Sequence, residues 1–254
     1  MRIMTYNLNG VRSANKKGVC DFLNRANADF YCLQETRATA QQICEELAPL
    51  EGKYQFVINE SERKGYSGTA VLAKVKPISY ENKLFDLNYD TEGRLQVLEY
   101  ENFFLINLYT PNGGTRLEYK MQFIDDLIQA LDMLIADGKD VILCTDFNIA
   151  HTELDLSNPE ECASITGFLP QEREIFDKFL SIGMFDVFRE LHPTKKRHTW
   201  SSYASKRASD NFGNLYTFDY IFVTENLLDK VRTCEILHDA MYSDHYPVKM
   251  EIDL

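Results

Sequence analysis

The sequence predicts an α/β fold: a four-layered sandwich in which two mixed, mostly antiparallel β-sheets pack face to face and helices cover their outer surfaces. Three observations support this prediction. Short segments rich in β-branched and aromatic residues outnumber the helical segments. Neighbouring strands are often close enough along the chain to form hairpins. The Gly-rich turn that a dinucleotide-binding parallel sheet carries after its first strand is missing from the sequence.

The chain is long enough for a substantial core, since 44% of its 254 residues are hydrophobic. No Pro-, Gly- or Ser-rich stretch divides it, and no short-period repeat is present. We therefore expect one domain spanning residues 1–254.

Strands are predicted wherever short β-branched and aromatic runs lie between turn formers. The residues Glu101-Asn102 separate two of these runs, and because Asn tolerates a positive φ a tight hairpin is expected there. The predicted strands cover residues 2–6, 30–33, 54–58, 69–73, 95–100, 103–109, 141–144, 218–223 and 248–252.

Helices are predicted between these strands. The longest has an apolar stripe at spacings of four and three and is followed by Gly138 as a stop signal. Further helices are expected over residues 17–26, 39–47 and 171–180. The stripe consists of Leu117, Met121, Ile124, Ile128, Leu131 and Ile135.

The composition limits the classes of function. The net charge of −12 disfavours tight, nonspecific DNA binding through a generally basic surface, although lysines lining a local groove remain compatible with it. None of the six cysteines forms a C-x-x-C pair, so we expect free thiols rather than disulfides or a zinc site. The cysteines are Cys20, Cys32, Cys44, Cys144, Cys162 and Cys234.

The N-terminus lacks the apolar core of a signal peptide, and no apolar run approaches the roughly 18 residues of a spanning helix. We expect a cytoplasmic protein without a membrane partner.

Polar residues recur where the predicted strands end. Asn7 and Asn9 follow the first strand, Glu35 follows the second, and Asp146 follows the strand at residues 141–144. Each of these residues taken alone has a simpler explanation, because Glu35 fits a solvated surface carboxylate and the asparagines fit turns. Rigid strand ends at one sheet edge nevertheless aim side chains into a shared cleft, so together these residues predict an active site.

Two further groups extend this prediction. Asp146 and Asn148 are two residues apart, so in extended backbone they point the same way; the alternative is an Asx-turn and nothing more. Near the C-terminus Asp244 stands beside His245, and Asp219 is a suitable partner to orient that imidazole. His151 is expected to be structural, bonding the turn that follows it.

Many separate motifs then occur in one order along almost the whole chain, and with them the sequence resembles the exonuclease III and apurinic/apyrimidinic endonuclease family of the endonuclease/exonuclease/phosphatase superfamily. SDH alone would indicate only the superfamily, whereas RLEYK, the DFNIAH block and GFLPQER indicate this branch. The motifs are YNLNGVR (6–12), LQET (33–36), KGYSGTAVL (64–72), EGR (92–94), LYTPN (108–112), RLEYK (116–120), DFNIAHTELDL (146–156), GFLPQER (167–173) and SDHYP (243–247).

The resemblance implies roles for the residues at the strand ends. Glu35 would be the main carboxylate ligand of Mg²⁺, with Mn²⁺ as an alternative, and Asp244, Asn7 and Asn9 would complete the metal site. Asp146 would orient or deprotonate the attacking water, and Asn148 would bond a phosphate oxygen. His245, oriented by Asp219, would stabilise charge growing on the phosphate, and Tyr109 would contact the phosphate or assist the leaving oxygen.

The resemblance also implies residues that bind DNA. A basic stretch at residues 195–200 and Lys206-Arg207 after it would track phosphates, the alternative being a solvated loop anchored by Trp200. Backbone contacts are expected from Tyr66, Arg94 and Arg116, with Lys64 as a further candidate, and walls of the abasic pocket from Trp200 and Tyr216.

The chain departs from the family at four places. Asn214 to Asp219 replaces the GWRxD pattern, so Thr217 stands where the family has an Arg. The loop between Trp200 and Asp219 is longer, and the segment after Asn112 is shorter. Asn9 replaces an Asp found in some members, which weakens the case for a second metal.

The resemblance implies a Mg²⁺-dependent hydrolase of base excision repair. It would act as a monomer on double-stranded DNA carrying abasic or 3′-blocked lesions. It would cut 5′ to the abasic site and leave a 3′-hydroxyl, with 3′→5′ exonuclease and 3′-phosphatase or 3′-phosphodiesterase as further activities. The alternatives are a superfamily phosphatase acting on a small molecule or lipid head group, a nonspecific nuclease, and a non-catalytic DNA-binding or scaffold protein.

Overall fold

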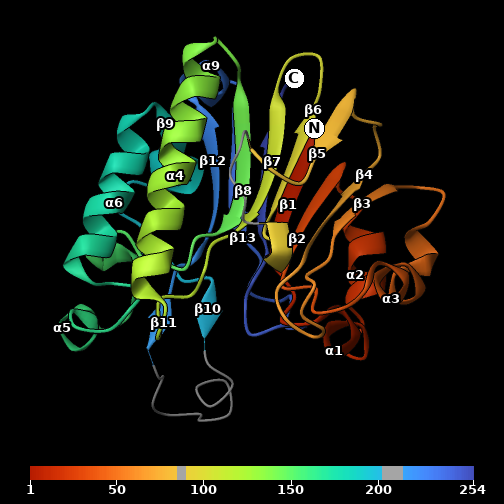
Figure 1. The fold of residues 1–254 in the computed structure, drawn as a ribbon, viewed down its shortest axis with the longest axis horizontal. Coiled ribbons are helices and arrows are strands. Elements are labelled where there is room, and N and C mark those ends of the chain that lie inside the picture. Colours follow the sequence, from red (N-terminus) through yellow and green to blue (C-terminus); the bar gives the residue numbers. More distant parts are fainter. Residues whose placement is uncertain (85–89, 202–213) are drawn as a thin grey trace.

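The computed structural model describes residues 1–84, 90–201 and 214–254. Two six-stranded sheets pack against each other, and helices lie on the outer face of each, so the predicted four layers are confirmed (Figure 1). The termini lie close together at one end of the sandwich, and the short strands β10 (Trp200–Ser201) and β11 (Leu215–Tyr216) lie at the opposite end.

The first sheet has the strand order β13-β14-β1-β2-β4-β3. Its neighbours are antiparallel except for β1 and β2, which run parallel. Its strands are β1 (Arg2–Asn7), β2 (Phe30–Gln34), β3 (Gln55–Asn59), β4 (Thr69–Ala73), β13 (Val231–Ile236) and β14 (Val248–Ile252).

The second sheet has the order β5-β6-β7-β8-β12-β9 and the same plan, with β7 and β8 as its parallel pair. The carboxyl ends of each parallel pair point the same way, which brings four strand ends to one side of the sandwich. Its strands are β5 (Ser79–Glu81), β6 (Leu95–Glu99), β7 (Phe104–Tyr109), β8 (Val141–Asp146), β9 (Met184–Asp186) and β12 (Asp219–Thr224).

The first sheet is covered by helices α1 (Val11–Asn15), α2 (Val19–Ala26) and α3 (Ala40–Glu46), and the second by α4 (Leu117–Ala136) and α6 (Pro170–Ser181) (Figure 1). Shorter elements connect these layers: α5 (Pro159–Cys162), α7 (Val187–Leu191), α9 (Glu225–Leu228) and the 3₁₀ turns Ala48–Leu50, Asp90–Glu92 and Glu153–Asp155.

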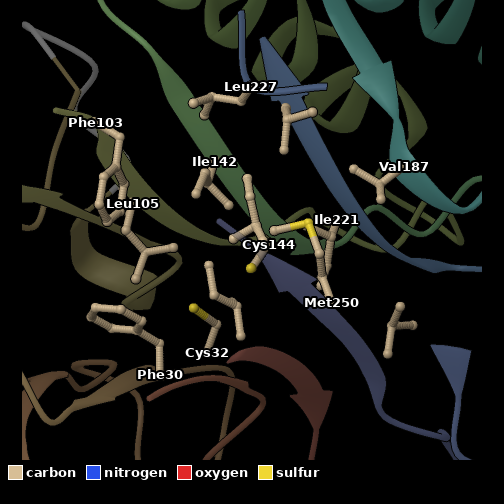
Figure 2. Packing of buried hydrophobic residues seen from close by; sticks show 14 of the residues in the cluster. Phe30, Cys32, Phe103, Leu105, Ile142, Cys144, Val187, Ile221, Leu227 and Met250 are labelled. Atoms are coloured by element: carbon tan, nitrogen blue, oxygen red, sulfur yellow. The ribbon is translucent and has the colours of Figure 1, made fainter. Parts of the chain in front are cut away.

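The sheets meet in a continuous apolar core. Phe30 and Cys32 of β2 approach Ile142 and Cys144 of β8 across it (Figure 2). The alternate residues of β2, Tyr31 and Leu33, belong instead to the core under the helices. Because both faces of the central strands are buried, their sequences are mostly apolar rather than alternating.

The sequence predictions hold for the long elements. The apolar stripe lies on α4, and Gly138 follows that helix with a φ of 77°. The hairpin between β6 and β7 forms at Glu101-Asn102, but Asn102 does so without a positive φ. Strands β5, β9, β10 and β11 were not predicted, because two or three residues are too few for a periodic pattern.

The strand β13 was also missed. It is an edge strand whose burial alternates irregularly around a bulge between Val231 and Thr233, so its sequence lacks a clean period of two.

All six cysteines are free, as predicted. Within the described residues, no helix is long and apolar enough to cross a membrane. The expectation of one domain over residues 1–254 stays a prediction.

Candidate active site

The four strand ends carry the residues singled out in the sequence. Asn7 ends β1, Glu35 follows β2, Tyr109 ends β7 and Asp146 ends β8. Tyr109 and Asp146 are register partners in the parallel pair of the second sheet. The predicted convergence of these residues is therefore confirmed, and it depends on both sheets.

A buried polar contact holds the sheets together beneath this edge. The Gln34 Nε2 donates to the Asn107 Oδ1 at 2.7 Å, and both side chains are fully buried. The Asn107 Nδ2 donates to the carbonyls of Leu33 and Ala70 at 3.2 Å. Because Gln34 precedes Glu35 and Asn107 lies two residues before Tyr109, the contact fixes the distance between the two halves of the site.

The Asn7 side chain joins the halves directly. Its Nδ2 donates to the Asp146 Oδ2 at 2.7 Å, and its Oδ1 accepts the Asn9 N–H at 2.9 Å. The other carboxylate oxygen of Asp146 accepts the Asn148 N–H at 3.0 Å. Asp146 is thereby fixed from two sides.

Two predictions were made for Asp146 and Asn148: an Asx-turn, and side chains that point the same way along extended backbone. The Asn148 N–H bond to Asp146 makes the Asx-turn, and the Asn148 φ of 54° shows that the backbone is not extended there. The expectation that an extended backbone would point Asp146 and Asn148 the same way is therefore wrong in its reasoning. Both side chains nevertheless line the same cavity.

Glu35 has a φ of 49°, a conformation that a non-glycine residue adopts only where its surroundings impose it. The Tyr109 hydroxyl donates to its Oε1, and the Arg37 guanidinium pairs with its Oε2. Burial, together with Glu35 and Asp146 nearby, raises the pKa of Tyr109 well above its usual value, so this phenol stays protonated and acts as a donor.

His245 is bound by Asp219 as predicted, with 2.8 Å between the His245 Nδ1 and the Asp219 Oδ2. The other ring nitrogen, Nε2, lies 3.9 Å from the Asp146 Oδ2. Burial alone would lower the pKa of His245, but Asp219, Asp146 and Asp244 together raise it to about 10. The imidazole is therefore cationic at neutral pH.

Asp146 differs from the usual carboxylate. Burial, opposed by His245 and the Asn7 hydrogen bond and aided by Asp219 and Glu35, raises its pKa to about 8. A carboxylate with a raised pKa is a stronger proton acceptor than a solvated one.

Asp244, which precedes His245, accepts hydrogen bonds from the side chains of Asn9 and Trp200. The Asn9 Nδ2 donates to its Oδ1 at 2.9 Å, and the Trp200 Nε1 donates to its Oδ2 at 3.2 Å. Burial would raise the pKa of Asp244, but His245 and the Asn9 and Ser243 hydrogen bonds lower it overall. Asp244 is therefore an anionic carboxylate at neutral pH.

These side chains open onto a cavity of about 330 Å³. The polar lining residues, which we call the catalytic wall, are carboxylates, amides and the imidazole: Asn9, Glu35, Asp146, Asn148, Asp244 and His245. The apolar lining residues, which we call the apolar wall, are Ile165, Trp200, Tyr216 and Phe218. In the apolar wall the Tyr216 and Phe218 rings stack with centroids 4.9 Å apart.

Two groups of side chains offer ligand atoms to a metal ion. Ligand atoms of Asp146, Asp219 and His245 lie within 4.8 Å of one another, but Asp219 and His245 are already bonded to each other. The donors around Glu35, Asn7, Asn9 and Asp244 are carboxylate and amide oxygens without a thiol, a set that fits a hard divalent cation. The predicted ligands are thus compatible with such an ion.

Tyr66, Arg94 and Arg116 were predicted as separate contacts to DNA, but the structure joins them. The Tyr66 hydroxyl accepts from Arg94 at 3.1 Å and from Arg116 at 3.0 Å, and Glu92 pairs with both guanidinium groups. Arg94 is only 1% exposed and donates to the Tyr109 carbonyl at 3.0 Å. The prediction that Arg94 contacts DNA is therefore corrected, because its buried side chain holds Tyr66 and Tyr109 in place instead.

The basic stretch at residues 195–200 also needs correction. Lys195 and Lys196 are exposed, but Arg197 is buried between Asp155 and Asp186, with 2.8 Å from its Nε to the Asp155 Oδ1. Lys206-Arg207 lies outside the described residues, as does most of the loop between Trp200 and Asp219.

His151 is structural, but not through the following turn. Its Nε2 lies 2.7 Å from the Asp177 Oδ1, and its ring stacks on Phe176 of α6.

The sequence reasoning missed several residues that line the cavity: Arg37, Asn112, Ile165, Thr166 and Phe218. Arg37 stands two residues after Glu35, and Phe218 stands between two predicted site residues, so both had a signal in their neighbours. Ile165 had none, because only the folding of the loop before α6 brings it to the cavity.

Comparisons with known proteins agree with this geometry. The model of the Endonuclease/Exonuclease/phosphatase family matches residues 4–245. An exodeoxyribonuclease of Bacillus subtilis is 37% identical over 259 residues, covering 100% of both chains. A DNA-(apurinic or apyrimidinic site) endonuclease of Dictyostelium discoideum is 35% identical and covers 100% of this chain and 71% of its own length. The solved structure of an AP endonuclease from Archaeoglobus fulgidus has a TM-score of 0.87 at 25% identity, with 100% of both chains covered.

Proposed function

The chain belongs to the endonuclease/exonuclease/phosphatase family, and on that premise we propose that it cuts duplex DNA 5′ to an abasic site, leaves a 3′-hydroxyl and uses Mg²⁺. It is a hydrolytic nuclease of DNA repair, of the exonuclease III and AP endonuclease branch. The lesion, the product and the identity of the cation are the proposed part. 3′→5′ exonuclease and 3′-phosphodiesterase activities are proposed for the same site.

One observation carries the proposal: the catalytic wall and the apolar wall face the same cavity. Phosphodiester hydrolysis needs a proton acceptor for water and positive charge near the phosphate. A deoxyribose without a base presents mainly an apolar ring face, for which aromatic side chains are suitable neighbours. Both requirements are met within about 330 Å³.

Asp146 takes the role of proton acceptor. Its carboxylate is fixed by Asn7 and Asn148, so it stays aimed at one position in the cavity. Its raised pKa makes the ionised form of Asp146 a stronger base toward the attacking water.

His245 offsets the charge that grows on the phosphate oxygens. Asp219 holds the imidazole in one orientation and in its cationic form. Such preorganised charge acts mainly on the transition state, because no side chain has to move when the negative charge develops. Asn148 and Tyr109 are proposed as further donors to phosphate.

Glu35 would hold the divalent cation, with Asp244, Asn7 and Asn9 as the remaining oxygen donors. The cation supplies positive charge that offsets the negative charge of the phosphodiester. Tyr66, Arg116, Trp200 and Tyr216 are proposed to bind the DNA around the lesion.

A duplex with one tetrahydrofuran abasic analogue, compared with an undamaged duplex of the same sequence, tests the proposal. With Mg²⁺ we expect a single cut 5′ to the analogue and a 3′-hydroxyl product, and with a chelator no cut. Equal cleavage of both duplexes would indicate a nonspecific nuclease, and release of phosphate from a small ester without DNA would support the phosphatase alternative.

A further inference from the structure

Two residues of the family motifs have no role in the site described so far: Lys120 of RLEYK (116–120) and Glu172 of GFLPQER (167–173). They meet in a buried ion pair. The Lys120 Nζ lies 2.6 Å from the Glu172 Oε1, and neither side chain has any exposed surface. Lys120 belongs to α4 and Glu172 to α6, so the pair lies in the helical layer outside the second sheet.

The remaining bonds of Lys120 lead to the catalytic wall. Its ammonium donates to the Asn148 carbonyl at 2.7 Å. Asn148 has a φ of 54° and follows Asp146 by two residues. A charged donor at this carbonyl therefore holds the turn that aims both Asp146 and Asn148 into the cavity.

The remaining bonds of Glu172 lead to the segment beside the apolar wall. Its carboxylate accepts the Gly167 N–H at 2.6 Å, the Leu169 N–H at 3.0 Å and the Thr166 hydroxyl at 3.2 Å. Thr166 and its neighbour Ile165 line the cavity. One ion pair thus fixes both walls.

The segment fixed by Glu172 is closely packed, so a small shift would be felt at the cavity. A Cβ at Gly167 would stand 3.0 Å from the Phe218 ring, which is part of the apolar wall. A Cβ at Gly113 would stand 1.9 Å from the Thr166 Oγ1. The segment therefore has backbone on one side and an aromatic ring on the other.

A gain in folding stability alone does not explain why such an ion pair is buried. Removing two charges from water is costly, and well-packed apolar residues often replace a buried ion pair without loss of stability. What an apolar pair cannot supply is a donor for the Asn148 carbonyl and acceptors for residues 166, 167 and 169.

We propose that Lys120 and Glu172 are a positioning pair that keeps Asp146 and Asn148 aligned with the apolar wall. The proposal rests on the proposed function, because it assigns the pair a part in catalysis by that site. Neither residue is proposed to touch substrate.

The test compares two pairs of substitutions between the same helices. Lys120→Met combined with Glu172→Gln removes both buried charges together, so no lone charge is left inside. Lys178→Met combined with Asp125→Asn is the matched control, because that ion pair also joins α6 to α4 but is exposed. Kinetics on the abasic-analogue duplex and melting temperature are measured for both.

We expect the buried-pair variant to lose roughly 10²-fold in kcat, the order of effect that misplacement of about 1 Å has on a catalytic group. KM should change far less, since DNA-binding groups at the surface are intact, and the control should match the wild type. A wild-type kcat in the folded buried-pair variant would overturn the proposal, as would a loss of kcat explained entirely by its unfolded fraction.

If the buried-pair variant does not fold, the Thr166→Val variant tests the proposal instead. It removes only the hydroxyl bond to Glu172, and we expect a lower kcat at an unchanged melting temperature. An unchanged kcat would overturn the proposal.

Failure of the proposed function gives a different result. If the wild type does not cut the abasic duplex, the crystal structures of wild type and variant still test positioning. The Asn148 carbonyl and residues 165–168 should be displaced in the buried-pair variant, and their coincidence with the wild type would contradict the proposal.

Discussion

The two walls of the cavity are built in different ways. Glu35 and Asp146 of the catalytic wall stand at the ends of long strands from both sheets, and neighbouring side chains hold the wall in place: Asn7 bonds Asp146, Tyr109 bonds Glu35, and Asp219 bonds His245. The apolar wall stands on the short pair β10–β11 and on the loop before α6, and rests largely on ring contacts. We infer that the sandwich fixes the residues of the proposed chemistry, whereas the proposed recognition of the lesion would depend on segments added to it.

Substitutions in the two walls should therefore have different effects on activity. A change in the catalytic wall should lower turnover, because it removes groups that act on the reacting phosphate. A change in the apolar wall should alter the choice of substrate by a smaller factor, because each ring contributes part of a contact surface.

The largest effect is expected for Glu35→Gln. It keeps an oxygen for the Tyr109 hydroxyl but removes the charge that would hold the divalent cation. Loss of that cation should lower kcat roughly 10³-fold, since it supplies several kcal/mol of charge stabilisation. Single-turnover cleavage and Mn²⁺ binding by calorimetry measure the two effects, and Glu45→Gln on the exposed side of α3 is the control. Undiminished Mn²⁺ binding would remove Glu35 from the metal site.

The next effect is expected for Asp219→Asn. The amide keeps the shape of the side chain, but the charge that raises the pKa of His245 is lost. We expect kcat to fall roughly 10²-fold, the scale for loss of one preorganised electrostatic group, with little change in KM. His245→Ala and the double variant complete the cycle. If the two losses simply add in free energy, Asp219 does not act through His245.

The sequence was sufficient for much of the site because several of its residues follow long strands. Asn7, Glu35 and Asp146 stand directly at strand ends, so knowing the strands is nearly the same as knowing which residues converge. The pairing of His245 with Asp219 was also predicted, although the two residues come from different sheets, Asp219 at the start of β12 and His245 before β14.

The supporting residues could not be predicted in the same way. Arg94 looked like a DNA contact because it is a cation in a family motif, yet it is 1% exposed and bonded to Tyr66 and Tyr109. Arg197 looked like part of a solvated basic loop, yet two aspartates enclose it. In both cases burial arises from contacts between residues far apart in the chain, which local composition does not encode.

The smallest effect, and the one that separates the walls most sharply, is expected for Tyr216→Leu. Leucine fills much of the same volume but cannot stack on Phe218, whose ring centroid lies 4.9 Å from that of Tyr216. Such an aromatic pair contributes roughly 0.5–1.5 kcal/mol, so KM for the abasic duplex should rise up to about tenfold while kcat changes less. Tyr216→Phe is the matched control: it loses only the hydroxyl, which bonds the Cys162 Sγ at 3.0 Å, and should stay near the wild type. A fall in kcat with unchanged KM would place Tyr216 with the catalytic wall instead. The ratio of rates on abasic and undamaged duplexes therefore decides whether the apolar wall recognises the lesion or merely closes the cavity.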